Sequence, residues 1–159
     1  MKNTGLVPLI NYGEVQRGLY RCAQPIHAYQ YEWLKEALGV RLIINLRAEN
    51  QTTDNKYGEI YEIKTVGFKV PDHQPPTSSQ ATEFMKLVKG TIDPMLIHCE
   101  HGHGRTSTFC VLAKVALGWS FDEAMEDEKR RWHYKFKYPA QELFLTEFIH
   151  LHNEQKTDR

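Results

Sequence analysis

The strongest constraint on this chain is a short apolar run, followed by a compact polar segment and a long apolar segment. Residues 95–97 predict a buried strand, and residues 106–117 predict an almost wholly apolar helix that Gly118 ends. A compact segment, residues 98–105, joins the two. A helix that is apolar on all sides belongs in a core, so we expect this strand–loop–helix unit to lie at the centre of the fold.

Short apolar runs and helical patterns alternate along the rest of the chain. Ile26, Tyr29, Trp33, Leu34 and Ala37 have helical spacing, and Gly67 is expected to end a polar helix before a strand through Phe68 and Val70. We expect strands at 19–22 and 40–46, helices at 26–38, 53–65, 78–89, 120–131 and 140–151, and a loop at 71–76. This alternation indicates the α/β class, with a mainly parallel central sheet flanked by helices in a single domain, residues 1–159. Ligands of such sheets bind at the carboxyl ends of the strands, where segment 98–105 lies.

Composition narrows the function classes. The 159 residues include 20 Lys and Arg and 20 Asp and Glu, so the net charge of zero offers no global field for nucleic acid or an anionic membrane. No apolar run reaches the roughly 20 residues that span a bilayer. Residues 1–10 hold one lysine and no apolar block of signal-peptide length. This predicts a cytoplasmic protein by default, or an exported one if a signal peptide was removed.

The segment between the strand and the apolar helix carries the chemistry. A tight loop at a helix N-terminus directs backbone N–H groups and the helix dipole toward an anion, and Gly102 and Gly104 allow the sharp turns. The same positive field favours the thiolate of Cys99, the nucleophilic form. Arg105 offers a planar fork for two phosphate oxygens, and the Thr106 hydroxyl can donate to the thiolate when it leaves. These roles predict transfer of a phosphoryl group to cysteine and then to water.

The order His98-Cys99-x-x-Gly102-x-x-Arg105-Thr106 resembles the signature of cysteine-dependent protein tyrosine and dual-specificity phosphatases. In that superfamily the general acid lies on a loop upstream of the signature. The resemblance therefore implies that Asp72 protonates the leaving oxygen, although an ordinary turn residue between prolines is the alternative. The rival acid, Asp93, precedes the strand that leads into the loop and should lie at the opposite end of the sheet.

Further matches resemble the phosphatase-fold phytases, which hydrolyse inositol polyphosphates. They are Glu100 directly after the nucleophile, the Asp72-His73 pair with a proline shortly after it, and residues 46–49 at a strand end. Residues 19–25 resemble the opening strand of small bacterial and plant-type dual-specificity phosphatases. The resemblance covers about residues 19–150.

The resemblance implies a metal-independent phosphomonoester hydrolase that works through a cysteinyl phosphate and needs no cofactor. Inositol polyphosphates such as phytate are the expected substrates, with phosphotyrosine proteins as the alternative and a phosphate-binding module without turnover as a third hypothesis. The third hypothesis conflicts with the joint presence of Cys99, Arg105 and Asp72.

Several basic residues are candidates for the rim of the site. Arg47 ends a buried strand at the edge where the loop lies, and either substrate contact or a structural ion pair would explain it. Residues 129–138 alternate aromatic and basic side chains, which fits a polyanion or an extended connection that packs its aromatics inward. The further rim candidates are His73, His101, His103, Lys135 and Lys137.

The remaining polar candidates have competing interpretations. His98 could orient the strand end through hydrogen bonds, or join Cys99, His101 and His103 in a zinc cluster, which the neighbouring Arg105 disfavours. Cys22 is either strand packing or a partner of Cys99 in a protective disulfide, and Cys110 is core. Gln141 either positions the attacking water or lies on a solvated helix surface.

Overall fold

The structure is a computed structural model that describes residues 6–132 and 138–157. The predicted α/β class with a mainly parallel sheet is confirmed. The elements follow in the order β1 (Gly13–Gln16), β2 (Leu19–Ala23), α1 (Ala28–Leu38), β3 (Leu42–Arg47), α2 (Thr52–Tyr61), β4 (Lys64–Val70), α3 (Ser78–Gly90), β5 (Met95–Cys99), α4 (Gly104–Ala116), α5 (Phe121–Trp132) and α6 (Pro139–Thr157).

The described chain divides into two compact units. The first unit contains the chain up to Lys69 together with Asp93–Gly102, and the second contains Val70–Ile92 and the chain from His103 onward. The expected single domain therefore stays a prediction.

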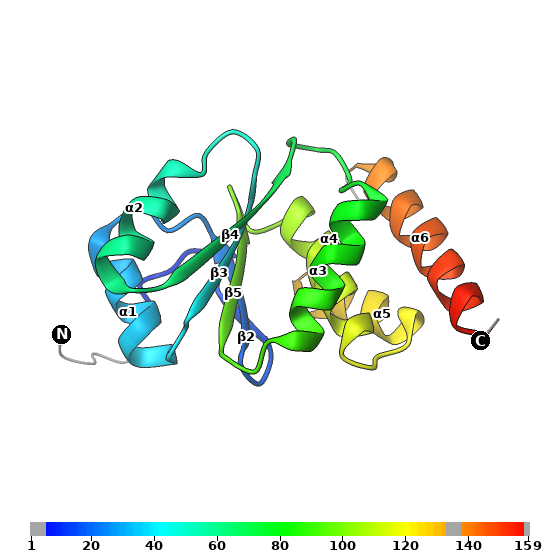
Figure 1. Cartoon of the computed structure of the whole chain (residues 1–159), viewed down its shortest axis with the longest axis horizontal. Coiled ribbons are helices and arrows are strands. Elements are labelled where there is room, and N and C mark those ends of the chain that lie inside the picture. The colour runs from blue at the N-terminus through cyan, green and yellow to red at the C-terminus, as the bar shows by residue number, and fades with distance from the viewer. Residues whose placement is uncertain (1–5, 133–137, 158–159) are drawn as a thin grey trace. The chain divides into compact units, whose positions relative to one another are not determined.

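The first unit is built on the sheet. Five strands lie in the order β1-β2-β5-β3-β4, and β5 pairs in parallel with both β2 and β3, whereas β1 pairs antiparallel with β2. Helices α1 and α2 lie on one face of this sheet (Figure 1). The core on that face contains Cys22, Tyr31, Leu34, Val40, Ile43, Ile63 and Leu96. Because the central strands are parallel, the carboxyl ends of β2, β3 and β5 meet at one edge, as predicted.

Helix α1 begins two residues later than predicted and buries a different face. The Gln30 side chain accepts hydrogen bonds from the backbone N–H groups of Ile26 (2.7 Å) and His27 (2.8 Å), so His27 caps a helix that starts at Ala28. The expected apolar face is only partly correct: Leu34 is buried together with Gln30 and Tyr31. Ile26, Tyr29 and Ala37 are exposed instead.

Helix α2 ends earlier than predicted. It stops at Tyr61, and Glu62 takes a left-handed conformation (φ 57°). Strand β4 begins at Lys64, whose backbone N–H donates to the Arg41 carbonyl (3.0 Å). The expectation that Gly67 ends the helix is therefore wrong. A Cβ at Gly67 would overlap the side chain of Gln51, so this glycine permits close approach within a strand.

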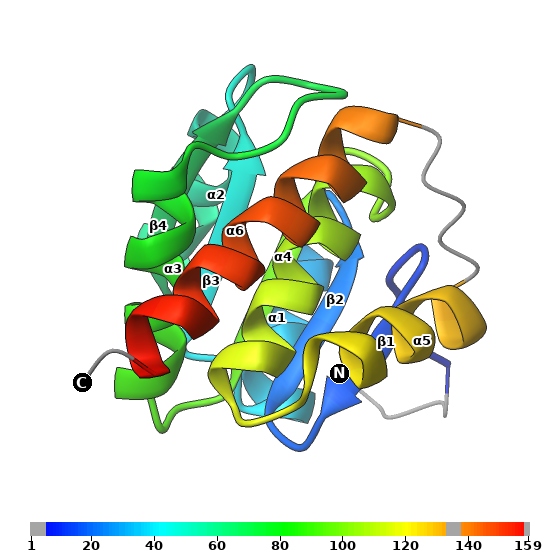
Figure 2. The ribbon, with the colours of Figure 1, turned by 90° about the vertical axis from the view of Figure 1, so that its right-hand side faces the viewer.

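The second unit contains four helices with α4 in the middle. Helix α4 packs against α3, α5 and α6 (Figure 2). It is buried on all sides from Arg105 to Val115, as its apolar sequence predicted. The rings of Phe84 on α3 and Phe109 on α4 meet edge to face at 4.8 Å. Helix α3 is capped by Thr77, which forms a capping box with Gln80.

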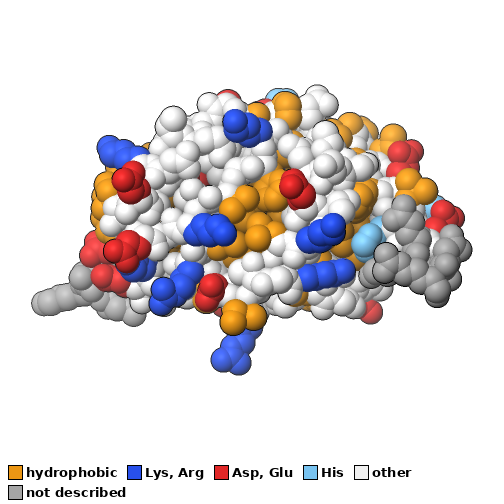
Figure 3. Space-filling view, viewed as in Figure 1, with side chains coloured by type: hydrophobic (Ala, Val, Ile, Leu, Met, Phe, Trp, Pro, Cys, Tyr) orange, Lys and Arg blue, Asp and Glu red, His pale blue; other side chains and the backbone are white. Residues whose placement is uncertain are grey.

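The surface agrees with the balanced composition. Basic and acidic side chains are interspersed on the face shown in Figure 3, so neither sign dominates there. Among the described helices, none has the length and apolar character to cross a membrane.

Candidate active site

The predicted anion loop runs from the end of β5 to the start of α4. Cys99 is the last residue of β5 and is 4% exposed, and Gly104 is the first residue of α4. Arg105 is the sixth residue after Cys99, and the loop passes from the first unit to the second after Gly102. Each half is anchored within its own unit.

His98 lies directly before the nucleophile and is fully buried. Its Nε2 makes a short contact with Oδ2 of Asp54 on α2, and its Nδ1 lies 3.2 Å from the backbone carbonyl of Cys99. The prediction of a hydrogen-bonded histidine at the strand end fits this geometry. Since both ring nitrogens of His98 face other partners, the ring has no nitrogen directed at a metal ion.

Asp54 is the buried centre of the polar cluster that surrounds His98. Its Oδ1 accepts hydrogen bonds from the hydroxyl of Tyr31 (2.5 Å) and from Nε2 of Gln24 (3.1 Å). Burial alone would raise the pKa of Asp54. The charge of His98 and the hydrogen bonds from His98, Tyr31 and Gln24 outweigh burial and lower it. Burial, with the neighbouring carboxylate, raises the pKa of Tyr31.

Two side chains from distant parts of the first unit hold the first half of the loop. Nη2 of the fully buried Arg21 donates to the Gly102 carbonyl (3.0 Å), and Nδ2 of Asn11 donates to the His101 carbonyl (2.7 Å). Gly102 has a φ of 79°, and a Cβ there would lie 2.9 Å from the backbone nitrogen of Ala23. Only glycine fits this turn without displacing β2.

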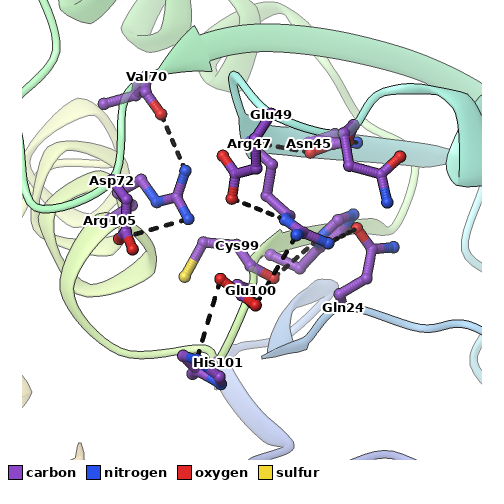
Figure 4. A network of polar contacts seen from close by, with 12 residues as sticks. Gln24, Asn45, Arg47, Glu49, Val70, Asp72, Cys99, Glu100, His101 and Arg105 are labelled. Carbon is purple, nitrogen blue, oxygen red and sulfur yellow. Dashed lines mark hydrogen bonds and ion pairs between the residues drawn. The ribbon is translucent and has the colours of Figure 1, made fainter.

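Arg47 is held in a network with acidic side chains at the same edge of the sheet (Figure 4). Its Nε lies 3.0 Å from Oε2 of Glu49, and its Nη2 lies 3.9 Å from Oε1 of Glu100. Nη1 donates to Oε1 of Gln24 (3.2 Å). The Arg47 side chain is 13% exposed, and its contact with Glu49 is the structural ion pair that we considered. Substrate contact by Arg47 and Glu100 stays a prediction, as it does for the exposed His101 beside Glu100.

The second half of the loop enters α4. The His103 carbonyl accepts from the backbone N–H of Ser107 (2.6 Å), while the His103 side chain is exposed. A Cβ at Gly104 would lie 3.0 Å from Oε1 of Gln141, so this glycine is packed against the glutamine. Gln141 is buried, and its Nε2 donates to the Gln74 carbonyl (3.4 Å). The alternative of a solvated Gln141 is therefore wrong, and its positioning of the attacking water stays a prediction. Thr106, one residue after the arginine, is fully buried.

Arg105 and the predicted acid lie together in the second unit. Nη1 of the buried Arg105 donates to the Val70 carbonyl (2.9 Å), and its Nη2 lies 3.5 Å from Oδ1 of Asp72 (Figure 4). The Asp72 side chain is 51% exposed and its Oδ1 accepts from the backbone N–H of His73 (3.0 Å). A fixed guanidinium with an accessible carboxyl beside it is the arrangement that phosphoryl transfer needs.

The remaining candidates are placed as follows. His73 has a left-handed backbone (φ 67°), and its ring stacks on Tyr138 with centroids 4.0 Å apart. Asp93 lies before the first residue of β5, so the length of that strand separates it from Cys99, as expected. Lys135 and Lys137 lie outside the described residues.

The structure also bears on the alternatives considered for Cys22 and Cys110 and on the zinc cluster. Cys22 is fully buried opposite His98 in the β2–β5 register, and burial raises the pKa of its thiol. Cys110 is core, as predicted. Within residues 6–132 and 138–157, no three His, Cys, Asp or Glu side chains gather as a metal site would require.

Three residues that support the site, Asp54, Arg21 and Asn11, were not predicted from the sequence. An arginine in the otherwise apolar strand 19–23 is a signal that could have identified Arg21, since a buried charge needs a fixed partner. Asp54 lies in a polar stretch that does not distinguish it from its neighbours.

Two curated proteins are similar to this chain in sequence. Inositol diphosphatase DSP3 of Arabidopsis thaliana is 28% identical over 131 residues, which cover 79% of this chain and 64% of the relative. Inositol diphosphatase SIW14 of Saccharomyces cerevisiae is 23% identical over 164 residues, which cover 99% of this chain and 56% of the relative. The chain thus spans less than two thirds of the length of either relative.

The crystal structure of the core catalytic domain of PP-IP phosphatase SIW14 from S. cerevisiae, in complex with citrate, has the same fold. It aligns with a TM-score of 0.74 at 22% identity and covers 90% of this chain and 88% of that chain. Residues 11–146 match the family described as PTP-NADK, the DSP-PTPase phosphatase fused to NAD+ kinase. The chain therefore belongs to this family of dual-specificity, tyrosine-phosphatase-like proteins.

Proposed function

We propose that this protein is a cysteine-dependent phosphomonoester hydrolase that needs no metal and acts on inositol polyphosphates. The observation that carries the proposal is the loop itself, which begins at the nearly buried thiol of Cys99 and ends at a guanidinium fixed by the Val70 carbonyl beside Asp72. Family membership supports the same chemistry.

In the first step the thiolate of Cys99 attacks phosphorus, and the bond from phosphorus to the ester oxygen breaks. Arg105 and the loop amides stabilise the negative charge on the equatorial oxygens. Asp72 gives its proton to the departing oxygen, which leaves as an alcohol. The products of this step are a cysteinyl phosphate and an ionised Asp72.

In the second step water attacks the cysteinyl phosphate. Asp72 accepts a proton from this water, and Gln141, buried beside Gly104, positions it. The sulfur leaves as a thiolate that the Thr106 hydroxyl stabilises. Inorganic phosphate is released, and the protonated Asp72 is restored.

The substrate class rests on the relatives and on the rim. Both curated relatives are named inositol diphosphatases. In our proposal Arg47, His73, His101 and His103 bind phosphates that are not being transferred, together with Lys135 and Lys137. Glu100 orients Arg47, with which it forms an ion pair of 3.9 Å.

The decisive experiment compares phosphate release from phytate, from an inositol polyphosphate that carries a diphosphate, and from a phosphotyrosine peptide. EDTA is present throughout and Cys99→Ser serves as the blank. We expect faster release from the inositol substrates and loss of release in Cys99→Ser. Faster release from the peptide would favour the tyrosine phosphatase alternative, and retained turnover in Cys99→Ser would contradict the covalent mechanism.

The role of Asp72 is tested with two leaving groups. Asp72→Asn should slow hydrolysis of an alkyl phosphate by about 100-fold or more and that of an activated aryl phosphate far less, because only the poor leaving group needs a proton. Equal loss on both substrates would assign the acid to another residue.

A further inference from the structure

Both ring nitrogens of His98 face hydrogen-bond acceptors. Nε2 faces a carboxylate oxygen of Asp54, and Nδ1 faces the backbone carbonyl of Cys99 at 3.2 Å. A neutral imidazole carries one N–H and could donate to only one of these acceptors. Both contacts are satisfied when His98 is an imidazolium and Asp54 is ionised.

The other donors around Asp54 support the ionised carboxylate. The Tyr31 hydroxyl and Nε2 of Gln24 both point at Oδ1, at 2.5 Å and 3.1 Å. Three donors from three different segments therefore converge on one buried acceptor. A protonated Asp54 would accept fewer hydrogen bonds than the carboxylate does. Some of these donors would then lose their partner inside the protein, where an unmade hydrogen bond is costly.

Cys22 from β2, Tyr31 from α1 and Cys99, which follows His98 in the chain, are titratable groups beside this pair. The buried Arg21 is a further cation of this cluster, and its charge acts on Cys22. Burial raises the pKa of Cys22 and of Tyr31, so these two groups are neutral. From β3 the register neighbour of His98 is Asn45, which does not titrate.

We infer that Asp54 is a positioning residue that keeps His98 doubly protonated directly behind Cys99, and that this fixed cation favours the reactive thiolate. The inference rests on the proposed role of Cys99 as the nucleophile. Asp54 contacts His98 and not the reacting atoms. It acts through the imidazolium, whose Nδ1–H donates to the carbonyl of the nucleophilic residue.

The same carboxylate also reaches the rim of the site. Gln24 donates to Asp54 with one end of its amide and accepts from Nη1 of Arg47 with the other, at 3.1 Å and 3.2 Å. The same Nε2 also donates to the Pro25 carbonyl (2.7 Å), so Asp54 and this carbonyl together fix the amide orientation that Arg47 requires. Asp54 therefore contacts the residue behind the nucleophile directly and contributes to the orientation of the rim arginine.

The test measures the reactivity of Cys99 without any turnover. Iodoacetamide alkylation of Cys99 is followed by peptide mass analysis from pH 4.5 to 9 in wild type, Asp54→Asn and Asp127→Asn. The asparagine at position 54 keeps the shape but removes the charge. We expect the midpoint of the alkylation profile to rise by about one pH unit or more, and the rate at pH 6 to fall about tenfold.

Asp127→Asn is the matched control, because it neutralises a buried carboxylate that pairs with Lys114 in the second unit. We expect it to destabilise the fold and leave the alkylation midpoint in place. An unchanged midpoint in Asp54→Asn, or an equal shift in Asp127→Asn, would overturn the inference. Absence of phosphate release from the wild type would contradict the proposed function and not the alkylation result.

A second measurement uses only the wild-type protein, in case Asp54→Asn does not fold. The side-chain ¹⁵N signals of His98, assigned by their loss in His98→Gln, should show two protonated nitrogens between pH 6 and 8. An unprotonated nitrogen in that range would overturn the inference.

Discussion

Two buried ionic clusters can be compared, one in each unit. In the first unit, Asp54 collects donors from His98, Tyr31 and Gln24. In the second unit, Nζ of the fully buried Lys114 lies 2.8 Å from a carboxylate oxygen of Asp127 and 2.8 Å from one of Glu128.

The two clusters differ in the part of the protein to which they connect. The Asp54 cluster ends on the backbone of Cys99 through His98. The Lys114 cluster joins α4 to α5, and its ammonium also lies over the rings of Trp119 and Trp132, at 5.6 Å and 5.1 Å from their centroids. In this comparison, burial of a charge does not by itself indicate function. What distinguishes the Asp54 cluster is its contact with the residue proposed as the nucleophile. The Lys114 cluster serves helix packing.

The largest effect on stability is expected from Lys114→Met. The substitution removes the buried ammonium that lies 2.8 Å from the carboxylates of Asp127 and Glu128. Among the ion pairs described, only Asp127 has further cations nearby, of which Arg131 is the nearest (3.3 Å), so the free energy of unfolding should fall by about 3–5 kcal/mol. Urea unfolding measures the loss, and turnover per folded molecule should not change. A loss below about 1 kcal/mol, or a changed turnover, would remove the distinction between the clusters.

The second-largest effect on stability is expected from acid, which should weaken the Asp54 cluster. The folded-state pKa of Asp54 is lowered, so its contribution to stability is complete above the unfolded value of about 3.9 and is lost as the pH falls through the folded pKa. Protonation leaves His98 as a single unpaired cation, so the effect should be smaller than that of Lys114→Met. Urea unfolding at pH 7, 5, 4 and 3 should show the stability difference between wild type and Asp54→Asn shrinking toward low pH. A constant difference would contradict the assignment.

The local parts of the fold and site were predictable from sequence because neighbouring residues specify them. An apolar strand, two glycines and an all-apolar helix identified β5, the loop and α4, and the spacing of Cys99 and Arg105 follows from the same segment. Asp72 lies 3.5 Å from Arg105, and its role as the acid stays a prediction.

Contacts between distant segments were not predictable. Asp54 meets His98 across 44 positions, and nothing in its own polar stretch distinguishes it from Glu59 or Glu62. The start of α1 was predicted two residues too early for a similar reason. The hydrogen bonds that Gln30 accepts place the start of the helix at Ala28, and hydrophobic spacing alone does not show them. Strand β1 was missed because its short polar sequence is defined by antiparallel pairing with β2.

Tyr31→Phe should have an intermediate effect. It deletes one buried hydroxyl that donates to the ionised Asp54, so we expect a loss of about 1–2 kcal/mol in the free energy of unfolding. The acid dependence should persist, since the carboxylate and His98 remain. Thermal and urea unfolding both report the change. If the loss were negligible, His98 and Gln24 would be sufficient to hold Asp54.

The smallest effect is expected at the exposed pair of Lys129 and Glu142. Their charged atoms lie 3.9 Å apart and both side chains are about half exposed, so water screens the attraction. Lys129→Met should change the free energy of unfolding by less than about 0.5 kcal/mol, although it removes the same charge as Lys114→Met. Because the two substitutions are chemically identical, their difference in urea unfolding isolates the contribution of burial and paired geometry. Equal losses at the two positions would show that burial of Lys114 does not make its ion pairs essential to the packing of α4 and α5.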